Sequence, residues 1–383
     1  MSEHYFHFKL NPIYLFGTYL NKMMKNKQKE ILFIVQYPEN ISPGQRFRFE
    51  LYLNLLSENG YKITTSSFFD KKGLEIIRQS GFILLKLCAV FRGYLKRIEL
   101  IFRLKKFDFI FLQREATPLG PPVFEWIYAK IFKKKVIYDF DDAIWMPYEV
   151  TESSFLIKLL KNKSKVKQIC QWSYKISCGN EYLCNYAIKY NSNVIYNPTC
   201  VDTENRYNLL ANHDVEKITI GWTGSFSTLN YLENLSPILR KLQVKYDFDI
   251  KIICNRKPNI CLKNLIYIPW TAENELTELA SCQIGLMPLT DEEWSKGKCG
   301  FKLIQYLALG IPAVSSAVGV NNNIVENGSN GFLCSTDEEW YYALEKMITN
   351  VALRKKMAIE GRKKIIAHYS LLSNKNNFLS MFN

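Results

Sequence analysis

Residues 294–316 read Trp-Ser-Lys-Gly-Lys-Cys-Gly-Phe-Lys-Leu-Ile-Gln-Tyr-Leu-Ala-Leu-Gly-Ile-Pro-Ala-Val-Ser-Ser, and this stretch decides the fold. It predicts a loop rich in lysine and glycine, a short apolar helix that ends at Gly310 and Pro312, and then a buried strand. A helix start carries unpaired N–H groups and partial positive charge. Lys298 and Lys302 near this start therefore predict a phosphate site, with a diphosphate as the expected ligand.

Short apolar runs alternate with longer helical segments on both sides of this stretch, which is typical of parallel sheets covered by helices. A first series of strands is predicted at residues 31–36, 61–66, 109–113, 136–139, 175–178 and 194–196. A second series is predicted at 218–222, 250–254, 265–268, 284–288, 313–315 and 331–334, with helices at about 229–245, 273–281, 301–309 and 337–349. Twelve parallel strands in one sheet would be unusual, so we expect two doubly wound Rossmann-like domains facing across a cleft.

An Asn-Pro turn at residues 197–198, followed by polar residues, predicts the join between the two domains. The predicted units are an N-terminal extension of unassigned role (1–29), a first domain (30–200), a second domain (201–365) and a C-terminal helix (366–383) that could pack back on the first domain. Ligands of such folds collect at the carboxyl ends of the strands. Every loop after a strand is thus a candidate site.

Composition narrows the class of protein. The 383 residues include 50 Lys and Arg against 36 Asp and Glu, a formal charge of +14 that favours an anionic partner. Ten cysteines without a C-x-x-C pair predict reduced thiols in a cytosolic protein rather than a zinc site or disulfides. No apolar run reaches about 18 residues, so no membrane span is expected. No helix-turn-helix, zinc-finger or RNP-like pattern occurs, so nucleic acid is not an expected partner.

The loop after the first strand contains three candidate residues. Gly44 would let the backbone approach a ligand closely, and Arg46 and Arg48 could pair with phosphate or carboxylate. The alternative is a solvated loop with ordinary surface arginines. We favour the functional interpretation because the loop follows the carboxyl end of a strand.

Charged residues also follow the next two buried strands of the first domain. Arg114 and Glu115 come after one strand, and Asp139, Asp141 and Asp142 end the other. Carboxylates this close raise each other's pKa or require a cation nearby. They could orient a substrate, form a helix cap or an ion pair with Arg114, or hold Mg²⁺, and we favour substrate orientation.

In the second domain, Trp222, Thr223, Gly224 and Ser225 end the first strand and begin a glycine-bearing loop, where backbone N–H groups can hold a phosphate. A plain tight turn is the alternative. The loop lacks the full G-x-G-x-x-G and G-x-x-x-x-G-K-[ST] patterns, so neither a nicotinamide cofactor nor a P-loop is expected. Two more donor-site candidates follow the third strand of this domain, Pro269 and Trp270.

Residues 82–106 predict a basic amphipathic helix. Leu87, Phe91, Tyr94, Ile98 and Ile101 share one face, and Arg92, Lys96, Glu99 and Arg103 share the opposite face. From 78 to 106 there are eight basic residues and Glu99, a net charge of +7. The helix either packs on the first sheet or contacts an anionic membrane surface, and both hold if the core uses only part of the apolar face.

Six motifs together resemble a known family. They are residues 42–48 (Ser-Pro-Gly-Gln-Arg-Phe-Arg), 113–115 (Gln-Arg-Glu), 138–142 (Tyr-Asp-Phe-Asp-Asp), 221–225 (Gly-Trp-Thr-Gly-Ser), 300–312 and 326–332 (Glu-Asn-Gly-Ser-Asn-Gly-Phe). The chain resembles the GT-B-fold glycosyltransferases of the family 4-like group, which make bacterial capsule, O-antigen and related surface glycans. The resemblance covers about residues 30–365, and the segment 300–312 is its most specific part.

The resemblance implies a retaining transfer without a catalytic metal or other cofactor. It places the nucleotide sugar mainly on the second domain and the acceptor mainly on the first, where Gly44, Arg46, Arg48, Glu115, Asp139 and Asp142 are the candidates. Breaking the sugar–phosphate bond leaves a negative diphosphate, and lysines at a helix start stabilise that charge. We therefore assign Lys298 and Lys302 to the leaving group and count Arg114 and Asp141 with them as catalytic candidates.

The sequence departs from the family pattern in two regions of the second domain. The family often carries two glutamates eight positions apart around this helix, and here Gly297 and Gln305 stand in their places. Gln305 can still hydrogen-bond ribose hydroxyls, but the carboxylate expected to orient the donor sugar is missing unless Glu292 or Glu293 substitutes. The common Arg and Lys after the first strand of the second domain are also absent.

Two functions follow from these observations. The first is a cytoplasmic glycosyltransferase, peripheral at the inner face of the cell membrane, that transfers a sugar from a nucleotide-sugar donor to a glycan or lipid-linked acceptor in bacterial surface polysaccharide synthesis. The second is a non-catalytic subunit that binds a sugar nucleotide or glycan, an alternative that the missing glutamates motivate.

Overall fold

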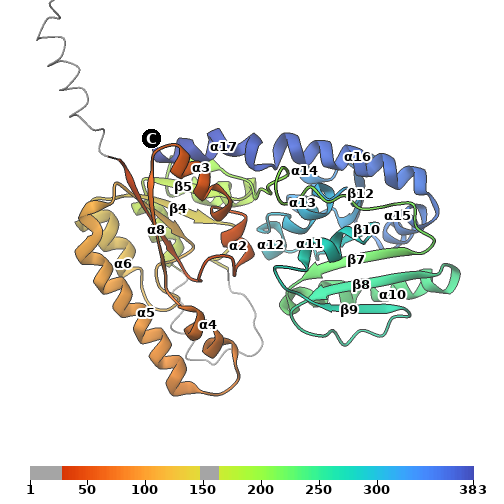
Figure 1. Cartoon of the computed structure of the whole chain (residues 1–383), viewed down its shortest axis with the longest axis horizontal. Coiled ribbons are helices and arrows are strands. Elements are labelled where there is room, and N and C mark those ends of the chain that lie inside the picture. The colour runs from red at the N-terminus through yellow and green to blue at the C-terminus, as the bar shows by residue number, and fades with distance from the viewer. Residues whose placement is uncertain (1–27, 147–163) are drawn as a thin grey trace, which may run out of the picture.

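The computed structural model describes residues 28–146 and 164–383, which form two lobes (Figure 1). Each lobe is built around one six-stranded, fully parallel sheet. The expected pair of Rossmann-like α/β domains is therefore confirmed. Of the predicted N-terminal extension, residues 1–27 lie outside the described residues.

The first sheet has the strand order β2-β1-β3-β4-β5-β6. Its strands are β1 (Glu30–Val35), β2 (Lys62–Ser67), β3 (Phe109–Gln113), β4 (Lys135–Phe140), β5 (Lys175–Cys178) and β6 (Val194–Tyr196). Along β1, Ile31 and Phe33 join one hydrophobic cluster, and Leu32 and Ile34 join another. Since successive side chains point to opposite faces, both faces of the sheet are covered, which explains the continuous apolar run.

The second sheet has the order β12-β11-β10-β7-β8-β9, which is the Rossmann order read from its far edge. Its strands are β7 (Ile218–Gly224), β8 (Phe248–Cys254), β9 (Leu265–Pro269), β10 (Ile284–Met287), β11 (Ala313–Ser316) and β12 (Gly331–Cys334). All twelve predicted strands are present, and their bounds differ from the predictions by at most two residues at either end.

Helices surround both sheets. In the first lobe they are α2 (Pro43–Arg46), α3 (Leu53–Glu58), α4 (Lys71–Arg78), α5 (Ile83–Arg103), α6 (Val123–Trp126), α8 (Lys165–Trp172) and α9 (Glu181–Ala187), with short turns η1 (Glu50–Tyr52), η2 (Leu104–Lys106) and η3 (Ile127–Ile131). In the second lobe they are η4 (Phe226–Thr228), α10 (Leu229–Lys245), α11 (Glu275–Ala280), α12 (Glu293–Lys296), α13 (Phe301–Ala308), α14 (Asn321–Ile324), α15 (Asp337–Thr349) and α16 (Val351–His368).

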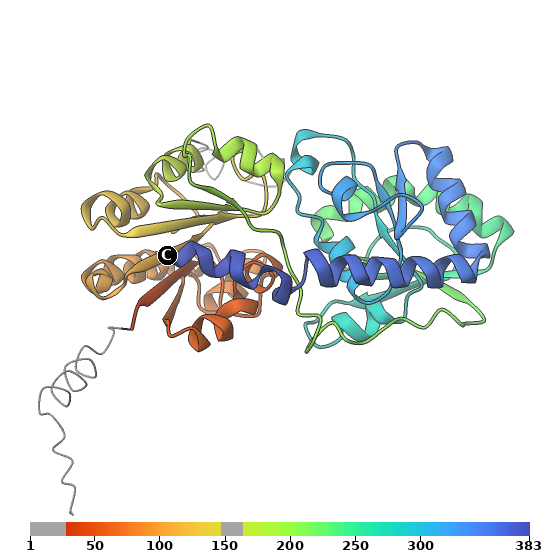
Figure 2. The ribbon, with the colours of Figure 1, turned by 90° about the horizontal axis from the view of Figure 1, so that it is seen from above.

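The end of the chain crosses from the second lobe to the first. Helix α16 lies on the second lobe, and α17 (Leu371–Leu379) with η5 (Ser380–Phe382) lies along the first (Figure 2). The ring of Phe378 stacks on Tyr52 with centroids 4.1 Å apart, and Met381 and Phe382 join the cluster of β1. This apolar contact ties the C-terminal segment to the first sheet.

Helix α5 is fixed to the first lobe by a narrow face of small and buried residues. A side chain at Gly93 would meet the ring of Phe68 at 2.5 Å, so only glycine allows this close approach. The buried guanidinium of Arg97 donates hydrogen bonds to the backbone oxygens of Ala116, Ser66 and Val35. Arg97, which we counted with the surface charge of this segment, therefore belongs to the interior.

No helix within residues 28–146 and 164–383 is both long enough and apolar enough to cross a membrane.

Candidate functional site

A cleft of about 440 Å³ lies between the lobes, a volume in the range of small-molecule sites. Residues of both lobes line it, and almost all belong to segments after the carboxyl ends of strands. The strand order reverses between β1 and β3 in the first sheet and between β7 and β10 in the second. Ligands of doubly wound sheets bind at such switch points, so the topology itself places a ligand here.

The structure brings most of the predicted site residues together. The cleft is lined by Gly44, Arg48, Arg114, Asp141, Asp142, Thr223, Gly224, Ser225, Trp270, Lys298, Lys302 and Gln305. Trp222 is buried beneath it, with its ring 5.5 Å from the Nζ of Lys302. The two sets of candidates, predicted separately on the two domains, thus face one another across one cavity.

Lys298 and Lys302 stand at the start of α13, as the sequence predicts. Lys302 is in the first turn of the helix, and Gly300 precedes it with a φ of 64°, a conformation that favours glycine. Neither lysine forms an ion pair with a carboxylate of the described residues; their contacts there are with the rings of Trp294 and Trp222. Two cations without a partner beside a helix N-terminus make this wall of the cleft suited to an anion.

The pKa of Lys302 is lowered to about 7. Burial is the main cause and the charge of Lys298 adds to it, while Asp142 acts in the opposite direction. A bound diphosphate would supply the missing countercharge and favour the protonated amine. An anionic ligand in the cleft would therefore increase the positive charge carried by Lys302.

Arg114 holds the two carboxylates at the end of β4. Its Nη2 lies 2.7 Å from Asp141 Oδ1 and 2.5 Å from Asp142 Oδ2. Burial alone would raise the pKa of Asp141, but Arg114 and Arg48 together outweigh it and keep that pKa below its ordinary value. For Asp142, burial and the neighbouring charge of Asp141 win over Arg114 and raise the pKa. Of the alternatives weighed for this cluster, the ion pair with Arg114 is present.

Asp139 does not line the cleft, although it was predicted to do so. It is completely buried and pairs with Arg48, whose Nη2 lies 2.5 Å from Asp139 Oδ1. Arg48 also donates to the backbone oxygen of Asn197 and to Ser177 Oγ. The difference arises because Asp139 still belongs to β4, whereas Asp141 and Asp142 follow the end of that strand, where the chain reaches the cleft. No three His, Cys, Asp or Glu side chains of the described segments are grouped to hold a metal ion.

Arg46 pairs with a carboxylate of the opposite lobe rather than standing free. Its Nη2 lies 2.7 Å from Glu275 Oε2, and both side chains are 3% exposed. Trp270 donates from its ring N–H to the other oxygen of Glu275. Glu275 and Trp270 line the cleft but Arg46 does not, and Arg46 Nη1 is buried without a hydrogen-bond partner among the described residues.

Glu115 and Pro269 are not part of the cleft lining. Glu115 accepts a hydrogen bond from Gln36 and pairs with Lys165 at 3.1 Å. Pro269 ends β9 and its backbone oxygen accepts from Asn274. Both follow strand ends, so the sequence pattern could not separate them from residues that do line the cavity.

The position of Gly297 explains one departure from the family pattern. A side chain there would meet Ala143 of the first lobe at 2.6 Å, so no carboxylate fits. Neither proposed substitute lines the cleft: Glu292 accepts from Tyr231, and Glu293 accepts from Tyr182. At the other position Gln305 lines the cleft and donates to Tyr207, and its buried Oε1 has no hydrogen-bond partner among the described residues.

Sequence reasoning missed Glu275, Arg78 and Asn255, which also line the cleft. Glu275 is the first residue of the polar helix α11. Nothing in the sequence of that helix indicates that Glu275 is buried. Arg78 ends α4 and was counted only with the basic segment. Asn255 directly follows β8, and the rule that every loop after a strand is a candidate site could have found it.

The lobes also touch directly. Asn180 donates from Nδ2 to the backbone oxygens of Lys296 and Lys298, at 3.1 and 2.9 Å. The thiol of Cys299 donates to the backbone oxygen of Asp141, and the rings of Phe47 and Phe301 lie 4.2 Å apart. The loop that carries the two lysines is thus held by the first lobe, and the arrangement of the cleft depends on both domains.

The two Rossmann-like domains with a cleft between them have the GT-B arrangement that the sequence motifs indicate. Residues 218–350 match the family model described as glycosyl transferases group 1. The chain has the GT-B fold, and its second domain carries the match to this family model. A comparison with curated protein sequences finds no match.

Solved structures with the same fold include sucrose-phosphate synthase from Thermosynechococcus elongatus, with 12% identity and a TM-score of 0.66, covering 92% of this chain and 97% of that one. A glycosyltransferase from Rickettsia africae has 14% identity and a TM-score of 0.64, covering 93% and 98%. HepE from Anabaena, solved with UDP and glucose, has 12% identity and a TM-score of 0.61, covering 92% and 98%. The likeness extends over both domains.

Proposed function

We propose that this enzyme transfers a hexose from a nucleotide sugar to a lipid-linked glycan acceptor, with retention, in bacterial surface polysaccharide synthesis such as capsule or O-antigen assembly. The observation that carries the proposal is the pair of lysines without a carboxylate partner at the start of α13. They face the cleft beside the Gly224–Ser225 loop, where a diphosphate can contact both lysines and backbone N–H groups.

The donor contacts divide between two parts of the second lobe. We assign the diphosphate to Lys298, Lys302, Gly224 and Ser225, and the nucleoside to Trp270, Thr223 and Gln305. The free Oε1 of Gln305 suits a ribose hydroxyl as donor. Because HepE was solved with UDP and glucose, uridine diphosphate sugars are the first donors to test.

The first lobe receives the acceptor. Gly44 brings its backbone next to Asp141, because a side chain at that position would meet Asp141 Oδ2 at 2.7 Å. Arg114 pairs with both Asp141 and Asp142, which lessens the repulsion between these carboxylates and the leaving diphosphate. We propose for the same reason that transfer needs no resident metal, since an arginine already occupies the carboxylates that would bind one.

We place the reaction in the cytoplasm at the inner face of the cell membrane, with residues 82–106 as the contact to anionic lipid. The exposed apolar side chains of α5 and the basic residues beside them support this location. A lipid-linked acceptor would then reach the enzyme from the membrane surface.

A panel of nucleotide sugars tests the donor assignment. A bound donor at about 100 times its dissociation constant stabilises the fold by roughly 2.7 kcal/mol, which is measurable as a rise in melting temperature. We expect such a rise in melting temperature with a nucleoside diphosphate sugar and not with the corresponding free sugar. Transfer is then followed with lipid extracts, and the anomeric configuration of the product is read by NMR. An inverted product would contradict retention.

A non-catalytic binding subunit is the second candidate, because no carboxylate fits at Gly297. This alternative predicts the same donor-induced stabilisation without transfer to any acceptor in the lipid extract. The two functions are therefore separated by product formation and not by binding.

Donor binding is expected to weaken as the pH rises above about 7. The diphosphate binds the protonated amine of Lys302, and the pKa of that amine is about 7 in the free protein. Above that pH the amine must take up a proton on binding, so affinity falls by up to about tenfold per pH unit until the pKa of the complex is reached. Calorimetry in buffers of different ionisation enthalpy measures the proton uptake.

The variant Lys302→Arg is the control for this pH dependence. Arginine keeps its charge across the whole range, so its profile should be flat between about pH 6 and pH 9. A wild-type profile that is equally flat would show that Lys302 does not contact the diphosphate.

A further inference from the structure

Helix α5 carries a row of exposed apolar side chains on its outward face. Six of them follow one another at spacings of three and four residues: Leu84, Leu87, Phe91, Leu95, Ile98 and Phe102. Leu84 and Phe102, at the two ends of the row, are 77% and 82% exposed. Side chains at such spacings form one continuous stripe on a helix. A stripe of this length on a protein surface marks an interaction site.

Contacts on the buried face of α5 keep this apolar row on the outside of the protein. Its buried residues, Ala89, Gly93, Arg97 and Leu100, lie on the opposite face. Gly93 packs against Phe68 and Arg97 donates to three backbone oxygens, so the rotation of α5 is fixed. The predicted apolar face is thus divided between interior and surface: Tyr94 contacts the first lobe, whereas Leu87, Phe91 and Ile98 point outward.

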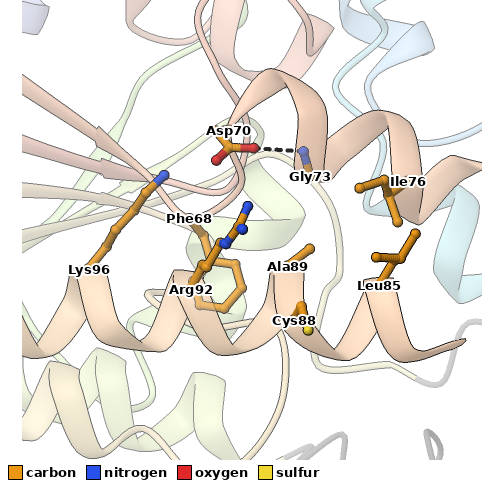
Figure 3. A pocket seen from close by; sticks show the side chains of 9 residues that line it. All are labelled: Phe68, Asp70, Gly73, Ile76, Leu85, Cys88, Ala89, Arg92 and Lys96. Carbon is orange, nitrogen blue, oxygen red and sulfur yellow. Dashed lines mark hydrogen bonds between the residues drawn. The ribbon is translucent and has the colours of Figure 1, made fainter. Parts of the chain in front are cut away.

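Beside this row, a small hollow lies between α4 and α5 (Figure 3). It has a volume of about 50 Å³, far below that of a metabolite site. Arg92 and Lys96 line it from α5, and neither forms an ion pair or hydrogen bond with another described residue. The one carboxylate in the lining, Asp70, is engaged at the start of α4, where it accepts a hydrogen bond from the backbone N–H of Gly73.

Charge and geometry select the partner that fits this face. At 3.6 residues per turn, Arg92 lies about 100° and Lys96 about 140° from the centre of the apolar row, so both cations flank the row on one side, where long side chains can extend toward the headgroups of a bilayer. A protein partner would need a complementary groove, whereas a bilayer offers acyl chains and negative charge in adjacent layers. Without the buried Arg97, residues 78–106 still contain seven basic residues against Glu99, a net charge of +6 that complements an anionic bilayer.

Helix α4 connects this face to the cleft. Gly73 and Ile76 line the hollow, and Arg78, two residues later, lines the cleft between the lobes. The helix has only eight residues, so a surface bound at one side lies within about 12 Å of the other along its axis.

We propose that the α4–α5 face binds the surface of an anionic phospholipid bilayer. The outward row of α5 enters the boundary between headgroups and acyl chains, and Arg92 and Lys96 bind the phosphates of the headgroups. The membrane is thereby held beside the rim of the cleft. This last role rests on the proposed function, since a lipid-linked acceptor would leave the bilayer next to Arg78, but binding to the bilayer does not depend on it.

Vesicle sedimentation with the full chain tests the proposal. The protein is expected to bind vesicles of phosphatidylcholine mixed with phosphatidylglycerol, and much less to phosphatidylcholine alone. The variant Arg92→Glu with Lys96→Glu should lower partitioning to the mixed vesicles by about tenfold or more. The variant Leu84→Ser with Phe91→Ser should lower it by a similar factor, because less apolar surface enters the bilayer.

Two matched variants serve as controls. Lys356→Glu with Lys375→Glu makes the same change of charge on α16 and α17, and both lysines are exposed and unpaired in the described structure. Val244→Ser with Ile359→Ser removes exposed apolar side chains of the second lobe. Both controls should bind vesicles like the wild type. Melting temperatures of all variants show whether they fold.

Three results would overturn the proposal. One is vesicle binding that the α5 variants leave unchanged, and another is equal loss in the control variants. The third is self-association of the wild type that Leu84→Ser with Phe91→Ser abolishes while vesicle binding persists, which would assign the row to a second copy of the chain. Donor-induced stabilisation and sugar transfer are measured without vesicles, so failure of bilayer binding is distinguishable from failure of the proposed donor binding and transfer.

Discussion

Replacement of Lys298 and Lys302 together by alanine is expected to lower sugar transfer by more than about a hundredfold. The departing diphosphate gains negative charge as the sugar–phosphate bond breaks. The amines of Lys298 and Lys302 line the cleft at the N-terminus of α13, where the helix dipole also favours an anion. Removing an oriented donor of this kind costs the transition state more than the ground state. The turnover number should therefore fall more than the affinity for the donor.

The matched control is Lys296→Ala. Lys296 lies in the same loop region but is already paired with Glu293 at 2.8 Å, and it does not line the cleft. Its removal should change transfer by less than about twofold, since an exposed pair contributes little. If the double lysine variant turned over donor at the wild-type rate, the assignment of these residues to the leaving group would be wrong.

The second large effect concerns stability. Arg48→Met is expected to lower the free energy of unfolding by about 3–5 kcal/mol, because it leaves the carboxylate of Asp139 buried without a countercharge. Methionine keeps much of the volume, so the loss reports charge rather than a cavity. Urea unfolding at neutral pH, followed by tryptophan fluorescence, measures the change.

Two further variants show whether the ion pair is the cause. Arg48→Met combined with Asp139→Leu removes both charges and should recover a large part of the lost stability. Arg240→Met, which removes an exposed arginine bonded to the backbone oxygen of Cys261, should change stability by less than about 0.5 kcal/mol. A double variant no more stable than Arg48→Met would mean that the hydrogen bonds of Arg48, and not Asp139, carry the effect.

The strands were predictable because parallel sheets covered on both faces need unbroken apolar runs, and those runs are local in the sequence. Phe109–Gln113 and Gly331–Cys334 occur at their predicted bounds for this reason. The start of α13 was equally readable, because Gly300, Gly310 and Pro312 mark its ends. Site residues on these local features were placed correctly near the cleft.

Contacts between distant segments were not predictable in this way. Nothing near Arg46 in the sequence indicates that Glu275, on the other domain, is its partner. The burial of Arg97 beneath α5 likewise depends on the carbonyls of three other segments. The helical pattern shows which residues share a face of α5, but it does not show which face the rest of the fold covers. That face is set by the close contact between Gly93 and the ring of Phe68.

The same limit applies to the missing glutamate. From the sequence, Gly297 is an unexplained absence, whereas in the structure it is a point of contact between the domains, against Ala143. A carboxylate does reach the cleft, but from Glu275 on α11 and already bonded to Arg46 and Trp270. On the side of the second lobe, the described residues of the cleft thus include Lys298 and Lys302, neither of which is paired with that carboxylate.

The most direct test of the central claim is a crystal structure with the nucleotide sugar that most stabilises the protein. The account predicts the diphosphate within hydrogen-bond distance of Lys302 Nζ, at the start of α13, with the Gly224–Ser225 loop on its other side. A donor bound outside the cleft between the lobes, or a diphosphate that points away from Lys298 and Lys302, would contradict it.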